Sequence, residues 1–238
     1  TNSPPRSYLS PSVIRITGNY DDSVKLADKE AREHGRIIVS DTSYPGYMEI
    51  AKDVALGYSV LLAESVAQMH GEIPSHVFIQ GGVGGLASAV CAYFWELWQD
   101  KRPRFIVVEP EAANCLQQSA RFGEPTVVHG DLDTLMAGLA CGEVSALAWE
   151  ILKIGADDFM TLNEQAVAPT MQLLARGWMG DPAIEAGESA VAGLAALITA
   201  RGDETMSRSL GLDETSSVYI LGTEGATDPE LYKKLLAG

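Results

Sequence analysis

This sequence contains few cysteines and no long apolar segment. Its three cysteines, Cys91, Cys115 and Cys141, lie far apart in 238 residues. An odd number at this spacing forms neither a disulfide framework nor a metal-binding motif, so a reducing compartment, the cytoplasm, is expected. No apolar run approaches the ~20 residues that a bilayer-spanning helix needs. The first residues show no signal peptide, so no membrane partner is expected.

Positive charge is also scarce. The 17 lysines and arginines oppose 32 acidic residues, which gives a formal net charge of −15. A surface of this sign disfavours nucleic acids and anionic membranes as partners, although it leaves room for a local phosphate site. The chain is 46% hydrophobic and 21% charged, which is typical of a folded soluble protein. Its length suits one large domain or two small ones.

The most informative segment is the sequence HVFIQGGVGGLA at residues 76–87. Residues 77–79 form a short apolar run that predicts a buried strand, and residues 86–98 are apolar at helical spacing. Between them, Gly81, Gly82, Gly84 and Gly85 permit positive φ angles and a close approach of the backbone to a ligand. Backbone N–H groups at the start of a helix form an anion site. We therefore favour phosphate binding over a tight turn that needs glycine for packing only.

Strand patterns and helix patterns alternate along the whole chain. This alternation predicts an α/β fold in which helices flank a twisted, mainly parallel sheet. The predicted strands are 13–17, 37–39, 77–79, 105–108, 158–162 and 218–221. The predicted helices are 23–34 with Ser23 as N-cap, 47–69, 86–98, 112–122, 146–154, 163–176, 187–201 and 229–236.

Polar residues follow several of the predicted strands. The turns 80–85 and 222–228 each follow a strand, and so do Asp41 and Glu109. In an open parallel sheet, ligands bind beyond the carboxyl ends of the strands. Each loop alone is best explained as a solvated connection, but several at one edge predict a pocket.

A dinucleotide site is an alternative for the same turn. Residues 82–87 fit the pattern G-x-G-x-x-A, and Glu109 ends the next strand about where a ribose-binding acid is expected. Against this alternative, Gln80 and Gly81 precede the glycines, and two predicted strands lie before the unit.

A set of motifs, taken together, resembles a known family. The sequences QGGVGGLA, VVEPE, MAGLACGE, AGESA and GTEGATD occur in this order. They resemble the large domain of pyridoxal-phosphate enzymes of the tryptophan-synthase-β type, known as fold type II. NYDDSV at 19–24, SDTSYPGY at 40–47 and LACGEVSALAWEIL at 139–152 more narrowly resemble the diaminopropionate ammonia-lyases. The resemblance extends from about residue 13 to the end of the chain.

The resemblance implies a lyase of amino-acid catabolism with pyridoxal 5'-phosphate as cofactor. Such an enzyme removes the Cα proton of 2,3-diaminopropionate and expels its β-amino group, which yields pyruvate and ammonia. The motifs place the cofactor phosphate on Gly81, Gly82, Val83, Gly84 and Gly85. They place the hydroxyl of Thr223 at the pyridine nitrogen. Asp41 matches a catalytic carboxylate beside the substrate, proposed as base for the D-isomer. No metal ligand is expected in the site.

Two features fit the resemblance less well. Glu188 is explained equally well as an acid that organises the sheet-end loops or a monovalent cation, or as a helix N-terminal acid. The family's Schiff-base lysine lies in an N-terminal motif that this sequence does not contain. The seven lysines all lie in charged helical or linking segments, where a solvated amine is expected. We therefore expect the N-terminal part of the enzyme to be missing and the present chain to be inactive.

The expected division of the chain follows from the same comparison. Residues 1–12 are expected to be a loop or a remnant of cloning, 13–40 a remnant of the smaller domain, and 41–238 the large cofactor-binding domain. The expected partners are a small amino-acid substrate and a second copy of the chain in a homodimer. The alternatives are a threonine or serine dehydratase, or a non-catalytic module that binds a phosphate or a dinucleotide.

Overall fold

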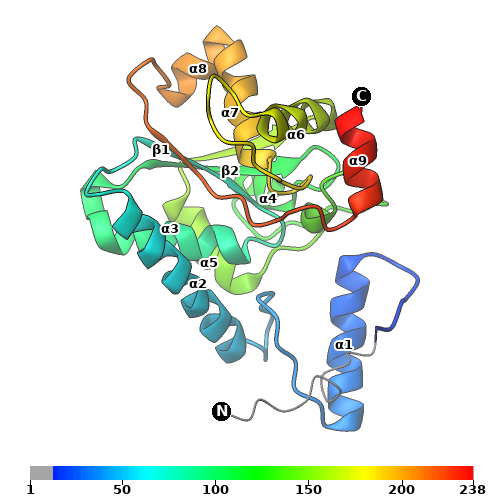
Figure 1. Cartoon of the computed structure of the whole chain (residues 1–238). Helices are drawn as coiled ribbons and strands as arrows, with labels where there is room; N and C mark the ends of the chain where they lie inside the picture. The colour runs from blue at the N-terminus through cyan, green and yellow to red at the C-terminus, as the bar shows by residue number, and fades with distance from the viewer. Residues whose placement is uncertain (1–12, 238) are drawn as a thin grey trace, which may run out of the picture.

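The computed structural model describes residues 13–237, so the prediction for residues 1–12 lies outside the described residues. Within this range, four parallel strands form one sheet in the order β3-β2-β1-β4 (Figure 1). The strands are β1 (His76–Gln80), β2 (Arg104–Pro110), β3 (Asp158–Leu162) and β4 (Val218–Ile220). The predicted α/β fold with a parallel sheet is confirmed.

The middle residues of the central strands, 77–79 in β1 and 105–108 in β2, are apolar because helices cover both faces of the sheet. Successive side chains point to opposite faces. In β1, Val77 and Ile79 are buried in one hydrophobic cluster, whereas Phe78 is buried in the other. The sheet thus separates two cores, and its backbone polar groups are paired along the ladder.

One face of the sheet is covered by α2 (Glu49–Gln68), α3 (Gly85–Trp98), α4 (Cys115–Phe122) and α5 (Ala146–Gly155). The other face carries α6 (Val167–Arg176), α7 (Ala192–Gly202), α8 (Glu204–Leu210) and α9 (Pro229–Ala237) (Figure 1). Short 3-10 turns occupy Gln99–Lys101, Ala137–Leu139 and Glu164–Ala166. Small residues bring α7 close to β1, and a Cβ on Gly193 would lie 2.6 Å from the Phe78 carbonyl oxygen. Among the α-helices of residues 13–237, only α8 was not predicted from the sequence.

The helix α1 (Tyr20–His34) stands beside this layered body (Figure 1). It begins three residues before the predicted N-cap Ser23, because Asn19 and Asp22 form a capping box. Its predicted end is confirmed, since Gly35 closes the helix with φ 63°. The Lys25 Nζ lies 2.6 Å from the Glu143 carboxylate and helps to hold α1 against the body.

The predicted strands at 13–17 and 37–39 are wrong. Both segments lack secondary structure, and their apolar side chains are exposed: 72% for Ile14, 82% for Ile37 and 74% for Val39. A β-type residue pattern becomes a strand only beside a partner strand. No strand of residues 13–237 runs beside either segment. Within residues 13–237 the apolar pattern of these two segments therefore does not lead to strands.

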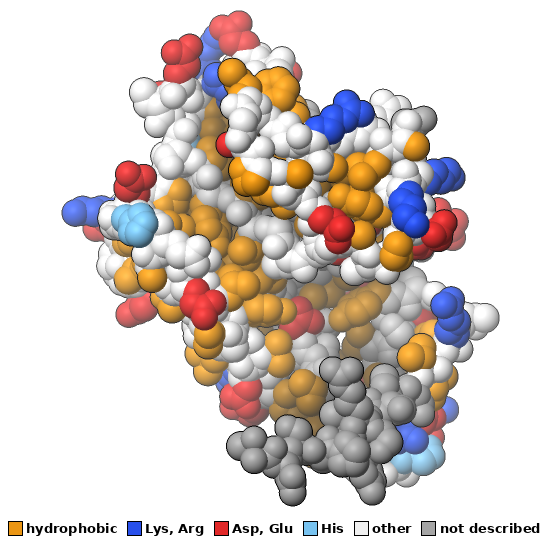
Figure 2. Space-filling view, in the orientation of Figure 1, with side chains coloured by type: hydrophobic (Ala, Val, Ile, Leu, Met, Phe, Trp, Pro, Cys, Tyr) orange, Lys and Arg blue, Asp and Glu red, His pale blue; other side chains and the backbone are white. Residues whose placement is uncertain are grey.

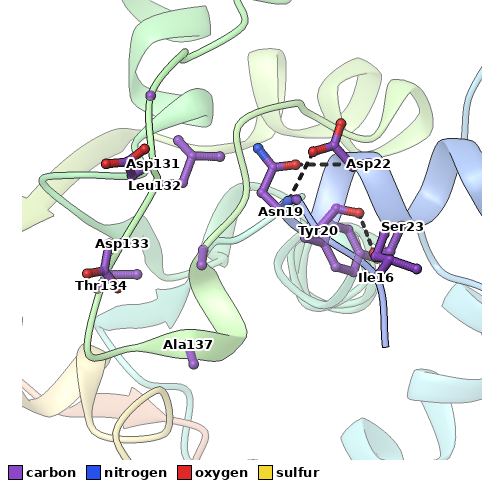
Figure 3. Close-up of a pocket in the computed structure, with 13 residues that line it drawn as sticks. Ile16, Asn19, Tyr20, Asp22, Ser23, Asp131, Leu132, Asp133, Thr134 and Ala137 are labelled. Atoms are coloured by element: carbon purple, nitrogen blue, oxygen red, sulfur yellow. Dashed lines mark hydrogen bonds between the residues drawn. The ribbon is translucent and has the colours of Figure 1, made fainter. Parts of the chain in front are cut away.

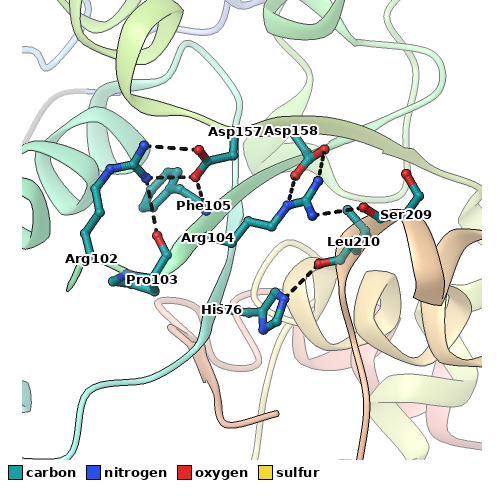
Figure 4. Close-up of polar contacts among 9 residues, drawn as sticks. All are labelled: His76, Arg102, Pro103, Arg104, Phe105, Asp157, Asp158, Ser209 and Leu210. Carbon is teal, nitrogen blue, oxygen red and sulfur yellow. Dashed lines mark hydrogen bonds and ion pairs between the residues drawn. The ribbon is translucent and has the colours of Figure 1, made fainter. Parts of the chain in front are cut away.

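The amino end of the sheet is closed by ion pairs. Arg104, at the start of β2, forms two hydrogen bonds of 2.6 and 3.0 Å with the carboxylate of Asp158, at the start of β3 (Figure 4). Arg102 forms a second such pair with Asp157, at 2.7 and 3.1 Å. The His76 ring shares a hydrogen bond of 2.9 Å with the Leu210 carbonyl oxygen. These groups satisfy one another and leave no unpaired charge for a ligand.

The surface is mixed in character. Figure 2 shows acidic and basic side chains around the rim of one face, with apolar side chains between them. No helix in the described part of the chain is both long and apolar enough to cross a bilayer.

Candidate functional site

A cavity of about 260 Å³ lies at the carboxyl end of the sheet. Segments from six parts of the chain meet there. Six of the seven predicted site residues line it: Asp41, Gly81, Gly82, Val83, Gly85 and Thr223. The other lining residues are Tyr20, Gln80, Leu86, Gly138, Leu139, Cys141, Ser189 and Glu224. The fold thus brings together residues that lie as far apart as Tyr20 and Glu224.

The glycine turn presents backbone to this cavity. Gly82 and Gly84 adopt φ angles of 63° and 94°, which other residues rarely adopt. A Cβ on Gly85 would overlap the Asp41 carboxylate. The helix α3 starts at Gly85 without a side-chain cap. Its first N–H groups have no acceptor within the helix, so the turn offers donors and the positive end of a helix dipole to an anion.

Gly84 differs from its neighbours because it faces the protein core. A Cβ at this position would lie 3.0 Å from the Ala148 side chain and 3.2 Å from that of Leu152. The Gly84 N–H already donates to the Gly81 carbonyl oxygen at 3.2 Å. Gly84 therefore shapes the turn and lets α5 pack behind it. A direct contact between Gly84 and a ligand remains a prediction.

Asp41 places a carboxylate in the cavity beside the start of α3. Burial raises the pKa of this carboxyl above its ordinary value. Nearby, the Tyr20 hydroxyl lies 2.8 Å from Thr42 Oγ1, and burial also raises the Tyr20 pKa. A carboxylate whose pKa lies closer to neutral is better matched to proton transfer than an exposed one.

Thr223 lies just after the end of β4 and is held by Gln80 at the end of β1. The Gln80 Nε2 donates to Thr223 Oγ1 at 3.1 Å and to the Leu221 carbonyl oxygen at 2.9 Å. Thr223 is one of the residues that line the cavity. A hydroxyl on this wall can bond to a polar atom of a bound ring.

A hydrogen-bonded chain joins the remaining loops of the cavity. The Gly138 N–H donates to Ser189 Oγ at 3.0 Å, and the Ser189 N–H donates to the Glu224 carboxylate at 2.8 Å. The sequence motifs contained these residues, but nothing in the pattern assigned them a position. Cys141 also lines the cavity, and burial raises the pKa of its thiol to about 12. It is therefore protonated near neutral pH.

Two acidic residues considered from the sequence lie elsewhere. Glu109 is fully buried and accepts hydrogen bonds from the N–H groups of Leu116 at 2.9 Å and Gln117 at 2.7 Å. It therefore caps the start of α4, and the dinucleotide alternative loses its ribose-binding acid. Glu188 is buried, with 6% of its surface exposed, and it is not among the lining residues. Its role remains a prediction.

A second cavity, of about 730 Å³, adjoins the first (Figure 3). Tyr20 lines both cavities. The segment 137–141 divides them, because Ala137 and Ala140 face the larger cavity and Gly138, Leu139 and Cys141 face the smaller one. Asp131 and Asp133 give the larger cavity an acidic wall.

None of the seven lysines, all of which lie within residues 13–237, lines the smaller cavity. Five of them pair with carboxylates on the surface: Lys25, Lys29, Lys52, Lys153 and Lys233. The cavity thus contains donors for an anion, a hydroxyl and a carboxylate, but no amine from the described residues.

Comparison with known proteins decides the family. Residues 8–212 match the family described as "Pyridoxal-phosphate dependent enzyme". The chain belongs to this family. Over 233 residues it is 36% identical to the diaminopropionate ammonia-lyase of Escherichia coli K12, in a match that covers 96% of this chain and 58% of that relative. The chain thus spans little more than half the length of the curated relative that it matches.

Solved structures agree with this assignment. The crystal structure of holo diaminopropionate ammonia lyase from Escherichia coli superposes with a TM-score of 0.86 and 35% identity, covering 93% of this chain and 56% of that one. A threonine deaminase from Solanum lycopersicum superposes with a TM-score of 0.69 at 18% identity, covering 91% of this chain and 57% of that one, which shows a shared fold. The predicted fold type II is confirmed.

The cavity fits the cofactor of this family. The cradle between Gly82 and Gly85, beside an uncapped helix start, suits a phosphate. Thr223 offers a hydroxyl on the β4 side of the cavity, which suits a ring nitrogen. Pyridoxal phosphate is therefore the cofactor that these residues would hold.

Proposed function

We propose that this chain is the cofactor-binding part of a pyridoxal-phosphate-dependent ammonia-lyase that converts 2,3-diaminopropionate to pyruvate and ammonia. The observation that carries the proposal is the meeting of a glycine cradle, Thr223 and the half-buried carboxylate of Asp41 in one cavity. Identity of 36% over 96% of this chain to a diaminopropionate ammonia-lyase supports the choice of substrate.

Each residue has a defined part in the proposed reaction. When bound, pyridoxal phosphate withdraws electrons and makes the Cα–H of an attached amino acid acidic. Gly81, Gly82, Val83 and Gly85 would anchor the phosphate through backbone donors. Asp41 would accept the Cα proton of the D-isomer on its carboxylate, because burial raises the pKa of this carboxyl.

A dehydratase acting on threonine or serine is the second candidate. It is favoured by 30% identity over 67% of this chain to a threonine dehydratase of Staphylococcus epidermidis. The sequence match covers only 36% of that relative and 67% of this chain, against 58% and 96% for the ammonia-lyase. The ammonia-lyase therefore remains the better proposal.

The chain alone would bind without catalysing. An amine of lowered pKa must reach the cofactor aldehyde, and the lysines of residues 13–237 lie outside the cavity. The 238-residue chain is therefore proposed to release no ammonia from diaminopropionate.

We further propose that residues 13–40 belong to a smaller domain and 41–238 to the large one. Exposed apolar side chains on segments 13–17 and 37–39 support this division, since a neighbouring strand would cover them. Free cysteines support a cytoplasmic location, and the acidic surface disfavours nucleic acid and membranes as partners. Homodimer formation is proposed from the apolar surface and is tested by sedimentation equilibrium, in which a monomer would contradict it.

A chimera tests the proposed reaction. The N-terminal segment that precedes the matched region of the Escherichia coli relative is fused before residue 13, to supply an amine that the described residues do not place in the cavity. The chimera should release pyruvate and ammonia from 2,3-diaminopropionate with kcat/KM at least tenfold above that for threonine or serine. Faster release of 2-oxobutyrate from threonine would favour the dehydratase and contradict the proposal.

A further inference from the structure

Gln80 is a buried polar residue to which neither the family resemblance nor the sequence pattern assigns a role. It is the last residue of β1, and only 5% of its surface is exposed. Its Nε2 donates to the Leu221 carbonyl oxygen and to Thr223 Oγ1. A carbonyl oxygen can only accept, so the amide nitrogen must face Leu221 and the orientation of the amide is fixed.

This orientation determines what Thr223 can do. The hydrogen bond from Gln80 occupies one lone pair of Thr223 Oγ1 and polarises its O–H bond, which makes the hydroxyl a better donor. No acceptor for this hydrogen lies within hydrogen-bonding distance in the described part of the chain. Because Thr223 lines the cavity, its hydrogen is available to a ligand there.

The other end of the amide does not stabilise the fold through a hydrogen bond. Its Oε1 is shut off from solvent and has no hydrogen-bond partner within residues 13–237. An unpaired buried acceptor is unfavourable, and an apolar side chain of the same length would avoid it. The hydrogen bonds of Gln80 are all made by its nitrogen, and one of them goes to Thr223.

We infer that Gln80 is a positioning residue that turns the Thr223 hydroxyl into a hydrogen-bond donor for the ring nitrogen of pyridoxal phosphate and so keeps that nitrogen unprotonated. The inference rests on the proposed cofactor site. An unprotonated ring withdraws electrons less strongly than a protonated one, which suits expulsion of a β-substituent over a long-lived carbanion. Gln80 acts through Thr223 and touches no reacting atom.

Ring-nitrogen NMR of isotopically labelled pyridoxal phosphate tests the inference on the 238-residue chain. In the unaltered chain the ring nitrogen should show the chemical shift of an unprotonated, hydrogen-bonded nitrogen that does not change with pH while the chain is folded. In Gln80→Met the shift should move toward the protonated value and become pH-dependent. The Kd for pyridoxal phosphate should rise by no more than about threefold, since the phosphate cradle is unchanged.

Two further variants secure the interpretation. Gln80→Asn withdraws the donor but keeps an amide, and it should reproduce the change if Gln80→Met fails to fold. The control is Gln172→Met, which removes a comparable bond from Gln172 Nε2 to the Leu235 carbonyl oxygen away from the cavity. It should leave the ring-nitrogen shift unaltered.

The outcomes separate the two claims. A bound cofactor with the same shift in the unaltered chain and in the folded Gln80 variants would overturn the role of Gln80 alone. A protonated ring nitrogen in the unaltered chain would overturn it too. A chain that does not bind pyridoxal phosphate would overturn the proposed cofactor site, and the inference with it.

Discussion

The two ends of the sheet differ in how completely their polar groups are paired, although the same strands form both ends. At the amino end, Arg104 and Asp158 satisfy each other directly, as do Arg102 and Asp157 (Figure 4). At the carboxyl end, β1 runs into the glycine turn, and the amide of Gln80 keeps one atom unpaired. The first end is complete as it stands, whereas the second offers unpaired donors and acceptors.

This difference locates function more reliably than cavity size does. The acidic side chains of the larger cavity, Asp131 and Asp133, are exposed, so solvent can satisfy them. The smaller cavity combines a half-buried carboxylate of raised pKa with an uncapped helix start. Polar groups that the fold withdraws from water without pairing them are costly, so their presence indicates a ligand.

The largest loss of cofactor affinity is expected from a substitution at the carboxyl end of the sheet. Gly85→Val places a side chain where the Asp41 carboxylate lies and obstructs the cradle. The affinity for pyridoxal phosphate should fall at least a hundredfold, about 2.7 kcal/mol, as measured by absorbance titration. Gly57→Val is the control, because a Cβ on Gly57 meets nothing within 4 Å. Equal affinity in the two variants would contradict the cradle.

The next prediction concerns an ion pair at the amino end of the sheet. Arg104→Met removes the side chain that donates two hydrogen bonds to the Asp158 carboxylate. The free energy of unfolding, measured by urea titration, should therefore fall by about 1–2 kcal/mol. Cofactor affinity should stay within about twofold. The exposed pair Arg208–Glu204 supplies the control, since Arg208→Met should change stability by less than about 0.5 kcal/mol. Loss of cofactor binding in Arg104→Met would show that the two ends are coupled.

Glu109 also lies at the carboxyl end of the sheet, but it does not line the cavity. It is therefore expected to affect stability and not cofactor binding. Burial raises its pKa from 4.5 to about 8, against the lowering effect of two backbone N–H donors. A raised pKa means that the folded chain holds the proton more tightly than the unfolded chain. Its contribution to stability is therefore complete below pH 4.5 and is lost as the pH rises through 8.

The free energy of unfolding should accordingly fall with rising pH over this interval, by up to about 1.4 kcal/mol per pH unit. Urea titrations at a series of pH values measure the slope. In Glu109→Gln the slope should flatten, because the substituted group does not ionise. An unchanged slope would assign the pH dependence to other groups.

The smallest expected effect concerns Thr223. Thr223→Val keeps the shape of the side chain and removes the hydroxyl. Affinity for pyridoxal phosphate should fall about threefold, ~0.7 kcal/mol, and the absorption spectrum of the bound cofactor should change. Thr215→Val, on an exposed loop, should alter neither. Identical spectra for Thr223→Val and the unaltered chain would remove Thr223 from the site.

Local patterns predicted most of the fold. The core strands β1 and β2 were recognised because continuous apolar runs bounded by glycine or proline are typical of a parallel sheet. The strands expected at 13–17 and 37–39 failed for a physical reason, since a strand depends on its neighbour as well as on its own residues. The short helix α8 was missed because its seven residues carry mostly polar side chains without a clear apolar stripe.

Sequence motifs proposed some residues of the cofactor site, whereas the positions of others depend on the tertiary structure. The motifs proposed the glycine turn and Thr223, and both follow strands whose carboxyl ends meet at one edge. The position of Tyr20 could not, because it depends on how α1 packs against residues 141–143. The roles of Gly84 and Glu109 also needed coordinates, since sequence spacing does not show which way a residue faces.

The central proposal is that the chain binds the cofactor at the carboxyl end of its sheet, and that no lysine of residues 13–237 supplies the amine that catalysis requires. The most direct measurement incubates the 238-residue chain with pyridoxal phosphate, reduces it with borohydride and locates adducts by mass spectrometry, beside an ammonia assay with diaminopropionate. We predict saturable binding by titration, no single labelled lysine and no ammonia release. A stoichiometric adduct on one lysine, together with turnover, would contradict the account.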